Sequence, residues 1–455
     1  MTLECRIPWL WPDAQMLRAE LMQLADEGRD TLSVRRAFTR LLALGDEALW
    51  ERKRREAAWA LIERGQHLPL RRGYAYEEPN DLDAIRRLRP RGPRRFRGKL
   101  TKAQRLDHIT GGWLGRCAGC LLGKPVEGVH TPELWRFLKA TSQWPLRDYI
   151  RFGVRGKAAR EFSCMVARKE WDAVRCMPVD DDTNYTAAAV LILEKHGSGF
   201  TAADVGQFWL DSLPLMSTCT AERAAYRNLA LNIQPPQTAL YRNPCREWIG
   251  AQIRADGWAY ASLGDAERAS EFAWRDACVS HVKNGIYGEM FVAAMIAAAP
   301  FAADLGELVR IGLSEIPRTS RLREAVVEAL GWRARGVSYD DAIARVHERW
   351  DEKALHHWCH TISNAVICVI ALLWGEEDFG RSISQAVQAG FDTDCNGATV
   401  GSILGVRLGV GRLPSRWTER LSDTLKTALA GYETVRISEI AWKTAAICEG
   451  LRRRA

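Results

Sequence analysis

The fold is decided by the stretch Gly390-Phe391-Asp392-Thr393-Asp394-Cys395-Asn396-Gly397-Ala398-Thr399-Val400-Gly401-Ser402. Its run of small residues predicts a helix whose glycine face lets another backbone come close. An aspartate or a threonine at the start of such a helix can cap the free amide groups. One cap is enough, and two carboxylates crowded at one helix start repel each other unless a cation lies nearby. The stretch therefore predicts either a capped, solvated helix end or part of a metal site.

A second acidic helix start lies far upstream, at Asp180-Asp181-Asp182-Thr183-Asn184, directly before the apolar run 185–194. If the two starts meet in the fold, four or five carboxylates and the threonine hydroxyls would surround one volume. Such oxygen ligands suit Mg²⁺, Mn²⁺ or Ca²⁺. The alternative is two separate helix ends, each capped and solvated. The excess of carboxylates in both stretches favours the metal interpretation.

Glycines recur at every fourth position in a predicted helix over 105–123, at Gly111, Gly115, Gly119 and Gly123. They leave a bare stripe on one side, which predicts close packing against another helix. The motif that ends this helix reads Gly115-Arg116-Cys117-Ala118-Gly119-Cys120-Leu121-Leu122-Gly123-Lys124-Pro125-Val126-Glu127.

In this order, the three segments resemble the signatures of the ADP-ribosylglycohydrolase family, which includes the dinitrogenase reductase-activating glycohydrolases. The resemblance covers roughly residues 105 to 450 and none of the first hundred. It implies an all-α, compact orthogonal helical domain with a metal cleft at its centre. We therefore expect a helical extension with a basic linker over 1–100 and an ADP-ribosylglycohydrolase-like domain over 101–455.

The resemblance also implies a set of site residues. The expected ligands of two Mg²⁺ ions, with Mn²⁺ as the alternative, are Asp180, Asp181, Asp182, Asp392 and Asp394. Glu127 and Asp392 are the expected catalytic residues. The sequence departs from the family at three places: Arg116 stands where many relatives have Asp, Asp180 where they often have Thr or Ser, and Cys395 where many have Thr. Because a thiol is a poor ligand for Mg²⁺, the Cys395 departure predicts one weaker metal position.

Four further residues, Gly250, Arg254, His281 and Asn364, are expected to bind substrate. A helix start led by Gly250 could hold a phosphate with its free N–H groups, and Arg254 could add charge or pair with Asp256 instead. A lone histidine such as His281 is more often packed and hydrogen-bonded, and the resemblance places it near the ligand. Asn364 lies one helical turn from His360, so the two side chains could face the cleft or bond each other.

The rest of the chain also reads as helix after helix, with helices predicted over 1–70, 414–430 and 436–451. Between the first helices and the main domain, the run 86–102 is rich in arginine and contains Pro90 and Pro93. It predicts a solvated basic connector, or else an arm that binds an acidic surface or phosphate, or a lid over the site.

Composition limits the class of protein. The 455 residues are 47% hydrophobic and 26% charged, as in ordinary globular proteins, and the net charge is +8. The basic run has few interleaved aromatic residues, which makes nucleic-acid binding an unlikely function. The twelve scattered cysteines and the absence of a signal peptide or long apolar run predict a reduced, cytoplasmic protein without a membrane span.

Together these features predict a metal-dependent glycosidase that hydrolyses the bond at the anomeric carbon of an ADP-ribosyl group, carried by a modified protein or an ADP-ribose-like small molecule. One alternative is a hydrolase of a small nucleoside or another N-glycoside, since the same metal and Glu127 would serve it. Another is a binding protein that neutralises an ADP-ribosylating partner.

Overall fold

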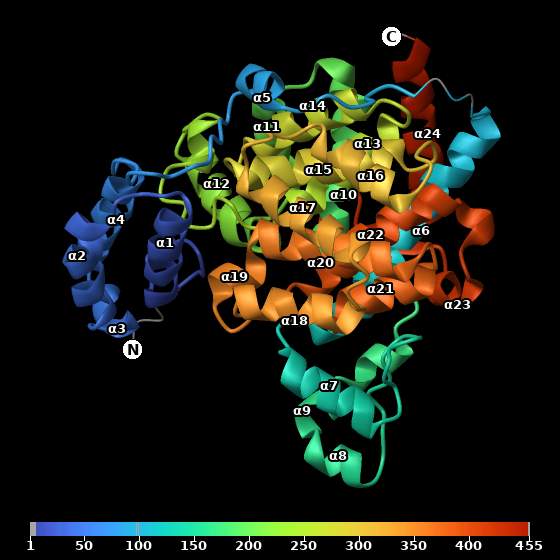
Figure 1. Ribbon diagram of the computed structural model, residues 1–455, viewed down its shortest axis with the longest axis horizontal. Coiled ribbons are helices and arrows are strands. Elements are labelled where there is room, and N and C mark those ends of the chain that lie inside the picture. The colour runs from blue at the N-terminus through green and yellow to red at the C-terminus, as the bar shows by residue number, and fades with distance from the viewer. Residues whose placement is uncertain (1–5, 97, 99, 454–455) are drawn as a thin grey trace.

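The computed structural model describes residues 6–96, 98 and 100–453. Arg97 and Lys99 of the basic run lie outside the described residues. Helices are the main secondary structure of the described chain and strands are almost absent, which confirms the all-α prediction (Figure 1). Among the described residues the extended elements are two short strands, β1 (Thr424–Lys426) and β2 (Thr434–Arg436), paired antiparallel with Leu425 opposite Val435.

The N-terminal part contains α1 (Ala14–Asp26), α2 (Leu32–Leu42), α3 (Asp46–Leu49), α4 (Arg52–Gln66) and α5 (Leu82–Leu88). The main body contains α6 (Lys102–Gly123), α10 (Asp181–His196), α11 (Ala202–Ser212), α12 (Thr220–Ala230), α13 (Ala255–Ala261), α14 (Ala266–Ala277), α15 (Asn284–Ala298), α16 (Leu305–Leu313), α17 (Arg321–Ala334), α18 (Tyr339–Arg349), α19 (Leu355–Cys359), α20 (Thr361–Gly375), α21 (Phe379–Gln388), α22 (Thr393–Leu408), α23 (Ser415–Thr418) and α24 (Ile437–Arg453). Three helices project from one side of this body, α7 (Thr131–Ala140), α8 (Lys157–Glu161) and α9 (Ser163–Val166) (Figure 1).

Helices α6 and α22 form the closest helix pair, and glycine makes their approach possible. A Cβ atom on Gly115 would overlap the carbonyl oxygen of Gly401, and one on Gly401 would overlap that of Gly115. Gly111 meets Gly405 in the same way one turn along. The packing predicted from the glycine stripe is therefore present. It fixes the C-terminal end of α6 beside the N-terminal end of α22.

The core around this pair is formed by helices that water does not reach. Every residue of α15 and of α20 is buried, which explains why both lack the polar face of a surface helix. The helix predicted over 414–430 is wrong, because α23 ends at Thr418 and the chain then forms the β1–β2 hairpin. The helix predicted over 436–451 is present as α24. Ser422 and Asp423 have positive φ angles there, a backbone conformation that a helix cannot accommodate. Among the described residues, no helix is long and apolar enough to cross a bilayer.

The N-terminal helices have a small core of their own and share a second one with the main body. Leu17 and Leu24 of α1 belong to the small core, whereas Met16 and Ala19, on its other face, belong to the main one. In Figure 1 helices α1 to α4 lie at one side of the molecule, next to α12 and α19, whereas α5 lies apart from them, near α11 and α14. The extension is therefore packed against the body through α1.

The basic run lies across the surface of the main body and is held there by ion pairs. Arg89 contacts Glu315 at 2.6 Å and Glu267 at 2.5 Å, and Arg94 contacts Glu315 at 2.8 Å. Arg86 reaches Glu271 at 2.8 Å. The acidic surface that this run binds is thus provided by the same chain.

Candidate metal centre

Three elements from distant parts of the sequence meet at one point. They are the end of α6, the start of α10 and the start of α22, and each brings at least one acidic or polar side chain. Ligand atoms of Cys120, Asp180, Asp182 and Asp394 all lie within 4.8 Å of one another, and all four residues are buried. The acidic helix starts therefore share one volume and are not separate solvated ends.

Local hydrogen bonds fix the starts of α10 and α22 beside this volume. Asp180 is the N-cap of α10, and its Oδ1 accepts a hydrogen bond from the backbone N–H of Asp182 at 2.9 Å. The hydroxyl of Thr393, the first residue of α22, donates to the carbonyl oxygen of Gly123 at 3.0 Å. Capping thus uses one aspartate oxygen at α10, and the remaining carboxylate oxygens are available to other partners.

Several of those oxygens have no partner among the described residues. Oδ1 of Asp392, Oδ1 of Asp394 and Oδ2 of Asp182 are buried without a hydrogen bond. Ligand atoms of Asp392, Asp394 and Cys395 lie within 4.8 Å of one another. Burial, followed by the charge of Asp394, raises the pKa of Asp392 well above its ordinary value. Unpartnered buried carboxylates are costly unless a cation compensates them, so these residues fit a hard divalent ion.

Lys124, directly after α6, lies among these carboxylates. Its Nζ is 2.8 Å from Oε2 of Glu127, 2.9 Å from Oδ2 of Asp180 and 3.2 Å from Oδ2 of Asp394. Glu127 remains partly accessible, with 39% of its side chain exposed. The charge of Asp394, followed by burial, raises the pKa of Glu127 to about 8. Glu127 therefore faces solvent and can exchange protons there, and Asp181, at the start of α10, is also partly exposed.

A second cation lies behind the centre. The Arg116 guanidinium is fully buried and bonds Asp182 at 2.9 Å and Asp256 at 2.8 Å. It also donates to the backbone carbonyl of Asp182 at 2.8 Å. Arg116, noted as a departure from the family pattern, thus holds the first turn of α10 in place. Its second partner, Asp256, cannot be inferred from sequence spacing, because the two residues lie far apart in the chain.

Asp392 is held by Asn364. Oδ1 of Asn364 accepts hydrogen bonds from the backbone N–H of Asp392 at 3.2 Å and from the side chain of Asn396 at 2.8 Å. Its Nδ2 donates to the carbonyl oxygen of His360 at 3.0 Å. The preceding residue, Phe391, has a positive φ of 57°, a conformation that non-glycine residues adopt only when their surroundings impose it. Asn364 therefore orients the loop that presents Asp392.

The other predicted substrate-binding residues lie in a buried ionic network. Arg254 contacts Glu222 and Asp276, each at 2.5 Å, and its guanidinium is almost fully buried. A Cβ atom on Gly250 would overlap the Glu222 carboxylate. Nδ1 of His281 shares a hydrogen bond with the Ser280 hydroxyl at 2.8 Å, and burial, followed by the charge of Arg254, lowers the pKa of His281 well below its usual range. Ligand contact by these three residues stays a prediction, and their present contacts are structural.

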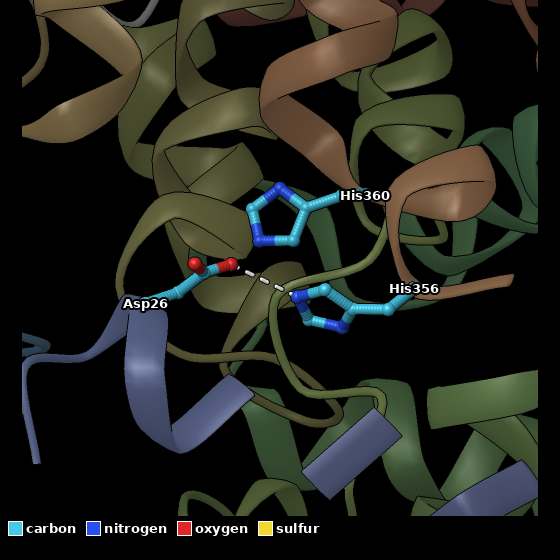
Figure 2. Close-up of side chains that lie close together, drawn as sticks. All are labelled: Asp26, His356 and His360. Carbon is cyan, nitrogen blue, oxygen red and sulfur yellow. Dashed lines mark hydrogen bonds and ion pairs between the residues drawn. The ribbon is translucent and has the colours of Figure 1, made fainter. Parts of the chain in front are cut away.

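A different cluster of potential ligands joins the extension to the main body: Asp26, His356 and His360 (Figure 2). Nε2 of His356 is 2.9 Å from Oδ2 of Asp26. Nδ1 of His356 accepts a hydrogen bond from the Trp248 indole at 3.1 Å, and Nδ1 of His360 accepts one from the backbone N–H of Ile362, also at 3.1 Å.

Those two donors cannot accept a hydrogen bond, so each neutral ring carries its hydrogen on Nε2, the atom that faces Asp26. A metal ion would need the lone pair of Nε2. We therefore assign the cluster as a hydrogen-bonded contact between α1 and α19 and not as a metal site. Burial alone would raise the pKa of Asp26, but the hydrogen bond from His356 lowers it below the ordinary value.

Comparison with known proteins places this geometry in a family. The family described as ADP-ribosylglycohydrolase matches residues 101–445. A solved structure described as an ADP-ribosylglycohydrolase-related protein complex is similar at 19% sequence identity, covering 76% of this chain and 99% of that one with a TM-score of 0.47. A search of curated proteins found no match. Because the family match spans most of the chain and includes all three acidic elements, this protein belongs to the ADP-ribosylglycohydrolase family.

Proposed function

We propose that this protein is a divalent-metal-dependent hydrolase that cleaves the glycosidic bond at the anomeric carbon of an ADP-ribosyl group carried by a modified protein. The observation that supports this most is the pair of buried, unpartnered oxygens, Oδ1 of Asp392 and Oδ1 of Asp394, beside a partly exposed Glu127. Family membership supplies the class of reaction.

Asp392 and Asp394 would hold the metal, with Asp180, Asp181 and Asp182 as the further expected ligands. A bound Mg²⁺ or Mn²⁺ would orient the adjacent hydroxyls of a ribose and stabilise negative charge that develops on oxygen. The hard oxygen donors, which outnumber the thiols of Cys120 and Cys395 in the two groups, favour these ions over zinc.

Glu127 would act as the general base. Its carboxylate is accessible, and it lies within the acidic group close enough to share Lys124 with Asp394. Water attacks the anomeric carbon, the bond from that carbon to the protein side chain breaks, and Glu127 accepts the proton that the water loses. The leaving side chain takes up a proton, so the products are ADP-ribose and the unmodified residue.

The test uses ADP-ribosylated protein and measures ADP-ribose release with Mg²⁺ or Mn²⁺ present and after chelation. Asp392→Asn and Glu127→Gln should each reduce release at least about 100-fold, since each removes a group that acts on the reacting atoms. Retained release in both variants, or in chelator, would overturn the proposal. Turnover of free nucleosides without turnover of modified protein would favour the alternative N-glycoside hydrolase. Metal-independent inhibition of an ADP-ribosylating enzyme would favour the binding protein.

A further inference from the structure

Lys124 occupies a position between carboxylates that a metal ion would otherwise take. Gly123, the residue before it, packs so closely on the start of α22 that a Cβ atom there would overlap the carbonyl oxygen of Thr393. This close packing places Lys124 next to the acidic group. Its ammonium contacts one carboxylate from each of three elements, Glu127, Asp180 and Asp394, within 3.2 Å.

Two cationic side chains, Lys124 and Arg116, therefore already form ion pairs with carboxylates of the centre. Lys124 uses Asp180 and one oxygen of Asp394, and Arg116 uses one oxygen of Asp182. The buried carboxylate oxygens of the centre that have neither a hydrogen bond nor an ion pair with the described residues are Oδ1 of Asp392, Oδ1 of Asp394 and Oδ2 of Asp182. Asp182 belongs with Cys120 and Asp180 to the group that Lys124 enters, whereas Asp392 and Asp394 form a smaller group with Cys395. Cys395 completes this smaller group, and its thiol is a poor partner for a hard ion.

We propose that this centre binds one divalent ion, at Asp392 and Asp394, and that the Lys124 ammonium replaces the second ion between Asp180 and Asp394. The inference rests on the proposed metal centre and departs from the two ions expected from the sequence. An ammonium supplies charge and three hydrogen bonds but has no empty coordination position. It can hold the carboxylates apart and in place, whereas a substrate hydroxyl can bind only at the single metal.

Charge and geometry make the two cations mutually exclusive at this position. A lysine nitrogen and a divalent ion cannot occupy the same space between Asp180 and Asp394, and a second ion nearby would be repelled by the ammonium. Only 25% of the Lys124 side chain is exposed, so moving the ammonium out would break all three ion pairs. Removal of the positive charge by mutation should therefore open a second metal position.

The experiment measures metal stoichiometry without substrate, by calorimetric titration of the full-length protein with Mn²⁺ and by electron paramagnetic resonance of the loaded protein. The wild type should bind one Mn²⁺ per chain and give the six-line signal of an isolated ion. Lys124→Met, which keeps most of the length of the side chain but not its charge, should bind two and show spin coupling between them. Lys124→Arg and the exposed-site control Lys102→Met should each bind one.

Two Mn²⁺ ions in the wild type would overturn the inference, whether or not the Met variant folds. One ion in both the wild type and a folded Lys124→Met protein would also overturn it, since Lys124 would then not exclude the second ion. Because no substrate is used, a failed assay on ADP-ribosylated protein leaves this result intact. No Mn²⁺ binding at all at millimolar concentration would instead overturn the metal centre of the proposed function together with this inference.

Discussion

Gly119 and Gly397 pack backbone against backbone: a Cβ atom on either residue would overlap the carbonyl oxygen of the other. The contact lies on the α6–α22 seam, close to the acidic centre. It matters for function because the start of α22 carries Asp394 and the end of α6 carries Lys124. The distances among these charged groups are therefore set by how closely two glycine faces can approach.

Substitution of Gly119 by Ala should be strongly destabilising. The new methyl group would meet backbone atoms, which cannot rotate away, so we expect a loss of about 3 kcal/mol in the free energy of unfolding, the upper range for overpacking. Gly450→Ala is the matched control, because Gly450 also lies in a helix but has open space around it. The control should gain up to about 1 kcal/mol. Urea unfolding of both variants tests the seam, and equal effects would contradict it.

Asn364 should matter for metal binding although no metal contact is assigned to it. Asn364→Ala removes the acceptor that holds the backbone N–H of Asp392 and the side chain of Asn396. Loss of an outer hydrogen bond of this kind typically weakens metal affinity about 10- to 100-fold. Mn²⁺ titration of the folded variant measures the dissociation constant. An unchanged constant would show that the α20 contact does not position Asp392.

Some of this site could be predicted from sequence and some could not. The glycine repeat predicts which face of α6 packs closely, because a period of four residues defines a helix surface. It does not identify α22 as the helix that packs there. The acidic stretches indicate a shared cation, because their local charge is too high for capping alone. Lys124 was visible only as a neighbour of Glu127, three residues away. Sequence spacing carries no information on its contacts with Asp180 and Asp394, which depend on the helix packing.

The same limit applies to Arg116, which departs from the family pattern, to Arg254 and to the hairpin after α23. Arg116 was recognisable as unusual, but its burial between Asp182 and Asp256 follows from the approach of α10 and α13. Arg254 reads as a ligand residue in the sequence motif, whereas long-range packing surrounds it with acids. The hairpin after α23 cannot be recognised from sequence, because each of its strands is only three residues long and shows too little alternation.

The contribution of His360 to stability should fall as the pH is lowered from 6.5 to 5. Burial, followed by the charge of neighbouring His356, lowers the pKa of His360 well below 6.5 in the folded protein. In that pH range the unfolded chain therefore binds a proton that the folded protein does not. Each such histidine costs about 1.4 kcal/mol per pH unit below 6.5, until the folded pKa is reached.

The variant His360→Asn isolates this effect. Asparagine keeps an acceptor for the backbone N–H at the start of α20 and cannot be protonated in this range. Denaturant unfolding at pH 7 and pH 5 should show a smaller loss of stability in the variant than in the wild type. The loss of stability in the variant is compared with the loss in the wild type. This comparison is needed because burial raises the pKa of Glu20 to about 7, which by itself makes both proteins more stable as the pH falls. Identical losses would show that His360 is not held neutral.

The extension should depend on Arg246 for its attachment. This buried guanidinium lies 2.6 Å from Glu20 and 2.7 Å from Glu27, both buried on α1 or at its end. Arg246→Met leaves the buried Glu20 without its cation, whereas Glu27 keeps Lys283 at 3.0 Å. Breaking a buried pair in this way costs about 3–5 kcal/mol. Arg52→Met is the control within the extension: its ion pair with Glu56 is exposed, so the change should stay below about 1 kcal/mol.

Limited proteolysis shows where that loss acts. Cleavage of Arg246→Met should begin between α1 and α5, while the main body persists, because the remaining contacts of the extension include the partly exposed Asp26–His356 pair. The double variant Glu20→Gln with Arg246→Met should recover part of the loss, since one unpaired charge is gone. If the single variant is cleaved no faster than Arg52→Met, α1 is held to the body by apolar contacts of Met16 and Ala19, and the buried ion pairs contribute little to its docking.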